Sequence, residues 1–150
     1  MAVSVRLRLG IVLAALALAL TAAVMASRSA EAQTVSGEAI VSEAQSYLGV
    51  PYVWGGESRA GVDCSGLVAA VFSDFGIYLP HSSYMQYSYG VPVSVPGPGD
   101  LVFSDYGYGF ASHVGIAVGN GQMIDAPYPG TVVRYDPIIP AYVDGYKSIV

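Results

Sequence analysis

Residues 61–76 read GVDCSGLVAAVFSDFG and combine a glycine-flanked turn with the most regular helical pattern in the chain. Apolar side chains recur at the spacing of one helix face, at Leu67, Val68, Val71, Phe72 and Phe75. Asp63 suits the N-cap position, and Gly76 suits the residue that follows a helix. We therefore predict a buried helix over residues 63–75.

The chain contains one cysteine, Cys64, at the point where this turn enters the helix. A single cysteine cannot form an internal disulfide, so its thiol is a buried apolar group, half of an intermolecular bridge, or a reactive group. The start of a helix stabilises a thiolate. The position of Cys64 therefore favours a reactive thiol.

The first 32 residues have the pattern of a secretory signal. Arg6 and Arg8 precede an uncharged apolar run over residues 9–24, and Ala30-Glu31-Ala32 fits a signal peptidase site. The run has 16 residues, whereas a membrane-spanning helix needs about 20; a retained anchor is the alternative. We predict cleavage after Ala32 and a secreted or cell-envelope protein without stable membrane association.

Removal of residues 1–32 leaves 118 of 150 residues, which is enough for one domain with its own core. We expect a leader over residues 33–37, a catalytic domain over 38–150 and no appended wall-binding domain. The signal holds three of the six basic residues and one of the eleven acidic residues, so three basic and ten acidic residues remain, a formal charge of −7. Such a charge argues against nucleic acid as a partner.

Outside the cysteine-bearing helix, the patterns predict helices first and strands later. Helical spacing indicates helices over residues 38–48 and 82–87, with a loop over residues 50–60 between the first helix and the cysteine turn. Strand patterns occur in the second half, at residues 101–103, 113–118, 122–126, 132–135 and 146–150. This order predicts an α+β fold, with N-terminal helices packed on one face of a small antiparallel sheet.

A cysteine nucleophile needs a base within hydrogen-bond reach and gains from a third group that orients the base. His113 opens a predicted strand, and Asp125 is an acid in the apolar run of the next one. A plain two-residue turn would place Asp125 on the opposite face from His113, whereas a three-residue loop would make them diagonal neighbours. A Cys64–His113–Asp125 triad therefore requires an odd-numbered loop or a β-bulge in this hairpin.

Five blocks of sequence together resemble the NlpC/P60 family in their order and spacing. They are PYVWGG at 51–56, DCSGL at 63–67, LPHSS at 79–83 with Gln86, GDLVF at 99–103 and HVGIAVGNG at 113–121. The resemblance covers about residues 38–149 and implies a papain-like fold. It also implies hydrolysis of peptidoglycan stem peptides, typically between γ-D-glutamate and the following diamino acid. Its partners would be stem peptides or muropeptides.

By position in these blocks, the resemblance implies that Cys64 is the nucleophile and His113 the base. The third residue of the family is often His and sometimes an acid, Asn or Gln, and here that position holds Asp125. A carboxylate suits this role because it fixes the imidazole tautomer and stabilises imidazolium. The Gly/Tyr loop over residues 106–110 is either a plain surface loop or a rim of the cleft.

Five further residues are candidates for oxyanion or substrate contacts. Tyr52 corresponds to a family tyrosine near the nucleophile. Asp63 and Ser65 flank the nucleophile where the family contacts the free amino end of the stem peptide, although Asp63 also fits a pure N-cap. Trp54 either packs in the cleft wall or stacks on a ligand. His81 is either a structural residue or part of a substrate subsite.

No spacing typical of a zinc site links the cysteine and the two histidines, so we expect neither a metal nor a cofactor. Two alternatives to the peptidase remain. One is a Cys/His acyltransferase or lipid amidase of related fold, although nothing resembles an acyl tunnel. The other is a catalytically silent module that binds cell-wall peptides, against which the intact Cys64 and His113 argue.

Overall fold

The helix that carries Cys64 forms where the sequence predicts it. In the computed structural model, which describes residues 34–150, α3 spans Cys64–Ser73. The Asp63 carboxylate accepts the N–H of Gly66, so the predicted N-cap is confirmed. Gly76 follows the last turn with a φ of 75°, a conformation that favours glycine. Because residues 65–72 are all buried, α3 is the central helix of the core.

The other helical segments are shorter. Helix α2 spans Gly37–Gln45 and begins at Ser36, whose hydroxyl accepts the N–H of Ala39. Helix α4 spans Ser83–Gln86, and a single 3-10 turn, η1, spans Pro140–Tyr142. Helix α2 therefore begins inside the expected leader. It ends at Gln45, before the predicted end at Leu48, because residues 46–49 form successive turns instead of continuing the helix. The expected signal over residues 1–32 lies outside the described residues.

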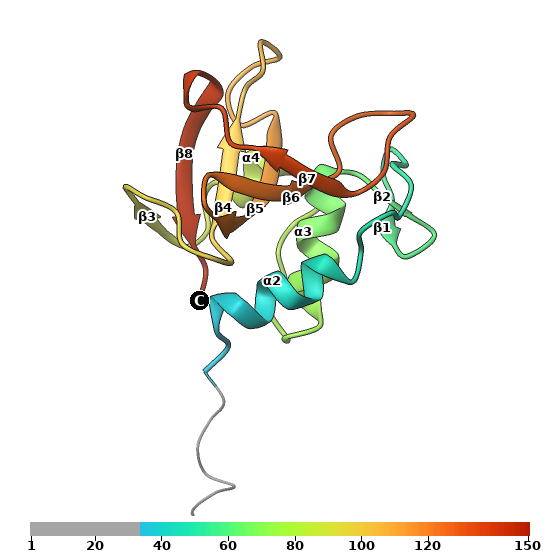
Figure 1. Ribbon diagram of the computed structural model, residues 1–150, viewed down its shortest axis with the longest axis horizontal. Coiled ribbons are helices and arrows are strands. Elements are labelled where there is room, and N and C mark those ends of the chain that lie inside the picture. The colour runs from blue at the N-terminus through green and yellow to red at the C-terminus, as the bar shows by residue number, and fades with distance from the viewer. Residues whose placement is uncertain (1–33) are drawn as a thin grey trace, which may run out of the picture. The chain divides into compact units, whose positions relative to one another are not determined.

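The second half of the chain forms a six-stranded antiparallel sheet (Figure 1). The strands are β3 (Val91–Val93), β4 (Leu101–Ser104), β5 (His113–Gly119), β6 (Gln122–Asp125), β7 (Arg134–Pro137) and β8 (Val143–Ser148). Their order across the sheet is β3-β8-β4-β5-β6-β7, so four consecutive strands meander and β8 returns beside β4. A separate hairpin, β1 (Glu57–Ser58) and β2 (Gly61–Val62), precedes α3. The predicted α+β class is confirmed.

The two faces of the sheet differ in what covers them. One face packs against α2 and α3 through the main core, which includes Phe72, Phe103, Val114, Ile116 and Ile124. The opposite face carries a smaller apolar cluster around Val102, Ala117 and Met123. Strand alternation places His113 and Asp125 on this second face, because Val114 and Ile124 point into the main core. Val35–Val150 form one compact unit.

Two predicted strands lie at shifted positions. The strand predicted at residues 132–135 is observed as β7, because the preceding residues pair elsewhere: Val133 exchanges backbone hydrogen bonds with Gly49 and Val50. The strand predicted at residues 146–150 is observed as β8, which begins at Val143 and lies between β3 and β4. The predicted loop over residues 50–60 contains β1, and β3 was not predicted. These two strands are only two and three residues long, which is too short for a periodic pattern.

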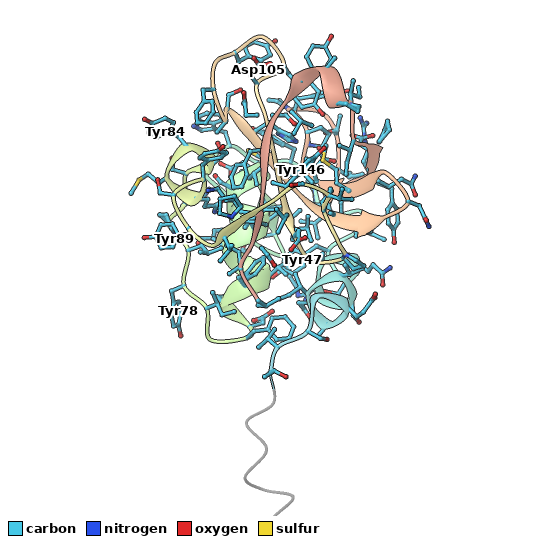
Figure 2. The ribbon with its side chains drawn as sticks, turned by 90° about the vertical axis from the view of Figure 1, so that its left-hand side faces the viewer. Tyr47, Tyr78, Tyr84, Tyr89, Asp105 and Tyr146 are labelled. Atoms are coloured by element: carbon cyan, nitrogen blue, oxygen red, sulfur yellow. The ribbon has the colours of Figure 1, made fainter. Side chains whose placement is uncertain are left out.

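Several tyrosines lie on the surface rather than in the core. Tyr78, Tyr84 and Tyr89 point outward on one side of the molecule (Figure 2). Within residues 34–150, none of the helices combines the length and the apolar character needed to cross a bilayer.

Candidate active site

Helix α3 presents Cys64 in its first turn, half-buried and without a disulfide partner. The loop before the helix lies directly across this turn, because Gly66 has no side chain. A Cβ at Gly66 would overlap the carbonyl oxygen of Gly56 and lie 2.9 Å from Nε2 of His81. Gly66 therefore allows the backbone of Gly56 to approach the first turn of α3 closely, which positions this loop next to Cys64.

A cluster of polar side chains behind Cys64 holds that loop. The Asp63 carboxylate accepts the N–H groups of Gly55 and Gly66, each at 2.8 Å, and lies 2.7 Å from Nε2 of His81. The other ring nitrogen of His81 lies 3.4 Å from Glu57. Ser65 donates a longer hydrogen bond, 3.3 Å, to Asp63. In this cluster, the Asp63 side chain connects the start of α3 to the loop that carries Trp54 and to His81, which in turn reaches Glu57 of β1.

The candidate base, His113, and its partner Asp125 come from neighbouring strands. Nε2 of His113 lies 2.7 Å from Oδ2 of Asp125, and both side chains are almost fully buried. The required irregularity is a β-bulge: Ile116 pairs with Ile124 and Ala117 with Met123, but Gly119 pairs with Gln122. The extra residue, Val118, shifts the register by one position, which brings Asp125 onto the face of His113. Of the two predicted irregularities, an odd-numbered loop or a bulge, the structure has the bulge.

Gly115 lies between the two partners on the same face. A Cβ at this position would lie 3.2 Å from Cβ of Asp125 and 2.7 Å from Sδ of Met123. The absence of a side chain at residue 115 therefore allows Asp125 to pack against β5 and reach His113 as a diagonal neighbour.

The pair is electrostatically unusual. Burial by itself lowers the pKa of His113, but the hydrogen bond to the Asp125 carboxylate and the interaction with Cys64 outweigh it and raise the pKa to about 9. Burial raises the pKa of Asp125, although His113 acts in the opposite direction. Among the described residues, Oδ1 of Asp125 has no hydrogen-bond partner. Around neutral pH, this environment favours imidazolium at His113.

The Gly/Tyr loop between β4 and β5 closes over His113. Tyr106 has a φ of 42°, which is uncommon for a residue with a side chain. Its ring packs edge-on against His113, with 5.5 Å between centroids, and lies tilted against the ring of Tyr142. Of the two interpretations of this loop, the structure supports the cleft rim. Tyr108 extends the rim and is 89% exposed.

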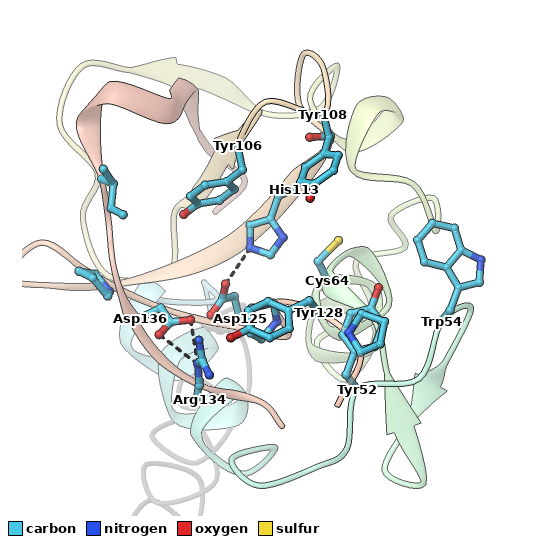
Figure 3. Close-up of a pocket in the computed structure, with 15 residues that line it drawn as sticks. Tyr52, Trp54, Cys64, Tyr106, Tyr108, His113, Asp125, Tyr128, Arg134 and Asp136 are labelled. Atoms are coloured by element: carbon cyan, nitrogen blue, oxygen red, sulfur yellow. Dashed lines mark hydrogen bonds and ion pairs between the residues drawn. The ribbon is translucent and has the colours of Figure 1, made fainter. Parts of the chain in front are cut away.

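These groups meet in a cavity of about 810 Å³ (Figure 3). Five of the predicted site residues line it: Tyr52, Trp54, Cys64, His113 and Asp125. Tyr52 lies beside the thiol, and burial together with the nearby Cys64 and Asp63 raises the pKa of its phenol. Trp54 is 85% exposed at the opposite end from Asp125. The other three candidates, Asp63, Ser65 and His81, belong to the polar cluster behind Cys64 and do not line the cavity.

The wall of the cavity beyond Asp125 was not predicted from the sequence. This wall is formed by residues 127–129 and by β7 with its flanking turn, and includes Tyr128, Arg134, Asp136, Pro137 and Ile139. One sequence feature could have indicated this wall: Arg134 and Asp136 are two positions apart, and residues at that spacing in a strand lie on the same face. The feature was not recognised because the predicted strand, residues 132–135, ended before Asp136. Among residues 34–150, no three His, Cys, Asp or Glu side chains are grouped as metal ligands would be.

A cysteine at the start of a helix, near a histidine that is hydrogen-bonded to a carboxylate, supplies the groups that a cysteine nucleophile and its base would need. The sequence profile of the NlpC/P60 family matches residues 49–147. The chain therefore belongs to the NlpC/P60 family, as its sequence blocks predict.

Curated relatives carry peptidase names. The chain is 52% identical over 101 residues to the "Probable endopeptidase p60" of Listeria seeligeri, which covers 66% of this chain and 19% of that one. It is 40% identical over 126 residues to the "Peptidoglycan endopeptidase RipA" of Mycobacterium tuberculosis, covering 74% and 26%. The chain thus spans about a fifth to a quarter of the length of these relatives.

Solved structures agree on the fold. The NlpC/p60 domain of the peptidoglycan hydrolase SagA is 40% identical, with a TM-score of 0.68, covering 76% of this chain and 99% of that one. The Resuscitation Promoting Factor Interacting protein RipA is 38% identical, with a TM-score of 0.65, covering 74% and 60%. RipA has been solved with mutations at a cysteine, a histidine and a glutamate. Those three positions have the same separations in sequence as Cys64, His113 and Asp125.

Proposed function

We propose that this protein is a secreted cysteine endopeptidase that hydrolyses peptidoglycan stem peptides between γ-D-glutamate and the following diamino acid. The observation that carries the proposal is the 2.7 Å bond between His113 and Asp125 in the cavity that contains Cys64. The matching separations of the three positions mutated in RipA support the same assignment. The names of the relatives support peptidoglycan as the substrate.

In the proposed reaction, each residue of the triad has a distinct part. Nε2 of His113 is hydrogen-bonded to Asp125, so Nδ1 is the ring nitrogen that can interact with Cys64. Nδ1 takes the thiol proton, which gives a thiolate and an imidazolium whose charge Asp125 balances. The raised pKa of His113, about 9, favours this charged pair at neutral pH.

In the acylation step, Sγ of Cys64 attacks the amide carbonyl carbon, and the carbonyl oxygen becomes negatively charged. The backbone N–H of Cys64, at the start of α3, and the Tyr52 hydroxyl are the proposed donors to this oxyanion. His113 then gives its Nδ1 proton to the leaving amine, and the C–N bond breaks. Water, deprotonated at Nδ1, attacks the resulting thioester and releases the acyl half as a carboxylic acid, which restores the thiol.

The test is mass spectrometry of defined muropeptides incubated with the protein, beside Cys64→Ala and Asp125→Ala variants. We expect a product that ends in γ-D-glutamate, no product with Cys64→Ala, and a partial loss of rate with Asp125→Ala. Parallel incubation with lipid amides and acyl acceptors covers the alternative enzyme classes. If no stem peptide is cut and Cys64 does not react with iodoacetamide, the enzyme proposal is wrong and a binding module is favoured.

Secretion is part of the proposal and rests on the signal pattern of residues 1–32. The expected mature protein begins at Gln33. N-terminal sequencing of protein recovered from the culture medium checks this, and recovery only from membranes with residue 1 intact would support the retained anchor instead.

A further inference from the structure

The cavity wall beyond Asp125 carries one fixed positive charge. Of the described residues that line the cavity, only Arg134 is an arginine or lysine. The other two basic residues of the described chain are engaged elsewhere: Arg59 pairs with Glu43 at 2.7 Å, and Lys147 lies over the ring of Tyr87. Besides the His113 imidazolium, Arg134 is therefore the cationic side chain of the described residues that a ligand in this cavity can meet.

The Arg134 side chain is held in place by Asp136, which uses only part of its hydrogen-bonding capacity. Its Nε donates to both carboxylate oxygens of Asp136, at 3.0 and 2.9 Å, and its guanidinium carbon lies 5.5 Å from the ring centroid of Tyr128. A guanidinium has five N–H donors, and Asp136 takes only the one on Nε. The side chain is 39% exposed. Tyr128 also interacts with the guanidinium, and the Nη donors that face neither Tyr128 nor Asp136 form a preoriented site for a planar anion such as a carboxylate.

The position of Arg134 relates it to one half of the substrate. Arg134 is directly paired with Asp125 across β6 and β7, so the two side chains share a face. From the thiol, the cavity runs past His113 and Asp125 to Arg134 (Figure 3). In the proposed reaction, His113 protonates the leaving amine, so the leaving half of the peptide lies on the His113 side of Cys64. A ligand group that reaches Arg134 therefore belongs to the leaving half.

We infer that Arg134, held by Asp136, binds a carboxylate of the leaving peptide and selects substrates that carry one. The inference rests on the proposed peptidase function. The leaving half begins with a diamino acid, so its carboxylate is either the one that ends the peptide or a second carboxylate on the diamino acid side chain. Both are the same chemical group, and the experiment distinguishes them.

The test compares kcat/KM for matched stem peptides. One peptide has every carboxylate of the leaving half free, a second has the terminal carboxylate amidated, and a third replaces diaminopimelate by lysine. We expect the wild type to lose about tenfold on the peptide that lacks the bound carboxylate, as for loss of a charge-assisted hydrogen bond. In Arg134→Gln, the ratio between that peptide and the free-carboxylate peptide should approach one. Arg59→Gln, which removes an arginine outside the cavity, should keep the wild-type ratio.

Each other outcome has a distinct meaning. If the wild type cuts all three peptides equally well, the inference is wrong while the peptidase function stands. If Arg134→Gln lowers every rate by one factor and preserves the ratio, Arg134 is only structural, and the inference is again wrong. If the wild type cuts none of the peptides, the proposed function itself fails.

Discussion

At the scale of single residues, the site depends on how two carboxylates are partnered. Asp125 faces the cavity and makes its hydrogen bond to His113, whereas Asp63 is turned away and holds backbone N–H groups and His81. Both acids are buried, and each has a histidine at 2.7 Å. Their roles differ because only the His113–Asp125 pair lies in the cavity with the thiol.

Asp125→Asn should change the pH dependence of catalysis. The wild-type rate is expected to fall as pH rises through about 9, where His113 loses its proton. Without the carboxylate, burial continues to lower the pKa of His113, so the alkaline limb should move to lower pH. We also expect kcat to fall at least about tenfold, because the imidazolium loses its partner. Profiles of kcat/KM against pH measure the effect. If the alkaline limb of the Asp125→Asn variant stays at the wild-type pH, that limb belongs to a group other than His113.

At the scale of elements, the β5–β6 hairpin sets the geometry of the site. Its bulge at Val118 changes which face of the sheet Asp125 occupies, and Gly115 provides the space that Asp125 needs. Neither residue contributes a polar side chain. The hairpin therefore contributes to the site through backbone register and close approach.

Gly115→Ala should reduce both activity and stability. The new methyl group would lie 3.2 Å from Cβ of Asp125 and 2.7 Å from Sδ of Met123; the methionine can move, but Asp125 must shift away from its position at His113. We expect about 1–3 kcal/mol of destabilisation and a loss of kcat/KM of about a hundredfold, measured by urea unfolding and peptide cleavage.

The matched control is Ala117→Gly, a change of one methyl group two residues along the same face, which contacts Met123 rather than Asp125. It should lower stability without a comparable loss of activity. Equal losses of activity in the two variants would mean that general loosening of the hairpin, and not the position of Asp125, accounts for the effect.

At the scale of the whole molecule, acidic side chains strongly outnumber basic ones. Residues 33–150 hold three basic and ten acidic side chains. Such an excess opposes binding to anionic polymers, while Arg134 offers one local cation inside the cavity. Long-range repulsion and local recognition therefore act in opposite directions on an anionic substrate.

Binding to purified anionic cell walls should strengthen as salt is added, because salt screens the repulsion over a Debye length of about 10 Å at 0.1 M. Glu38→Gln with Asp74→Asn, which removes two exposed carboxylates outside the cavity, should bind walls more tightly at low salt. Cosedimentation with walls across a salt series measures both. Wall binding by the wild type that instead strengthens as salt falls would show that attraction dominates.

By itself, the sequence was sufficient to predict α3 with its Asp63 cap, the α+β class and the family. It also predicted that a Cys64–His113–Asp125 triad requires an odd-numbered loop or a bulge in the β5–β6 hairpin. These features depend on local periodicity and on motif spacing, which a chain carries before it folds. Only the tertiary structure decided that Asp63, Ser65 and His81 lie behind the cysteine, and that Arg134 and Asp136 form the far wall of its cavity. Those positions follow from the pairing of strands and loops distant in sequence, such as Val133 with Gly49 and Val50, which no local pattern specifies.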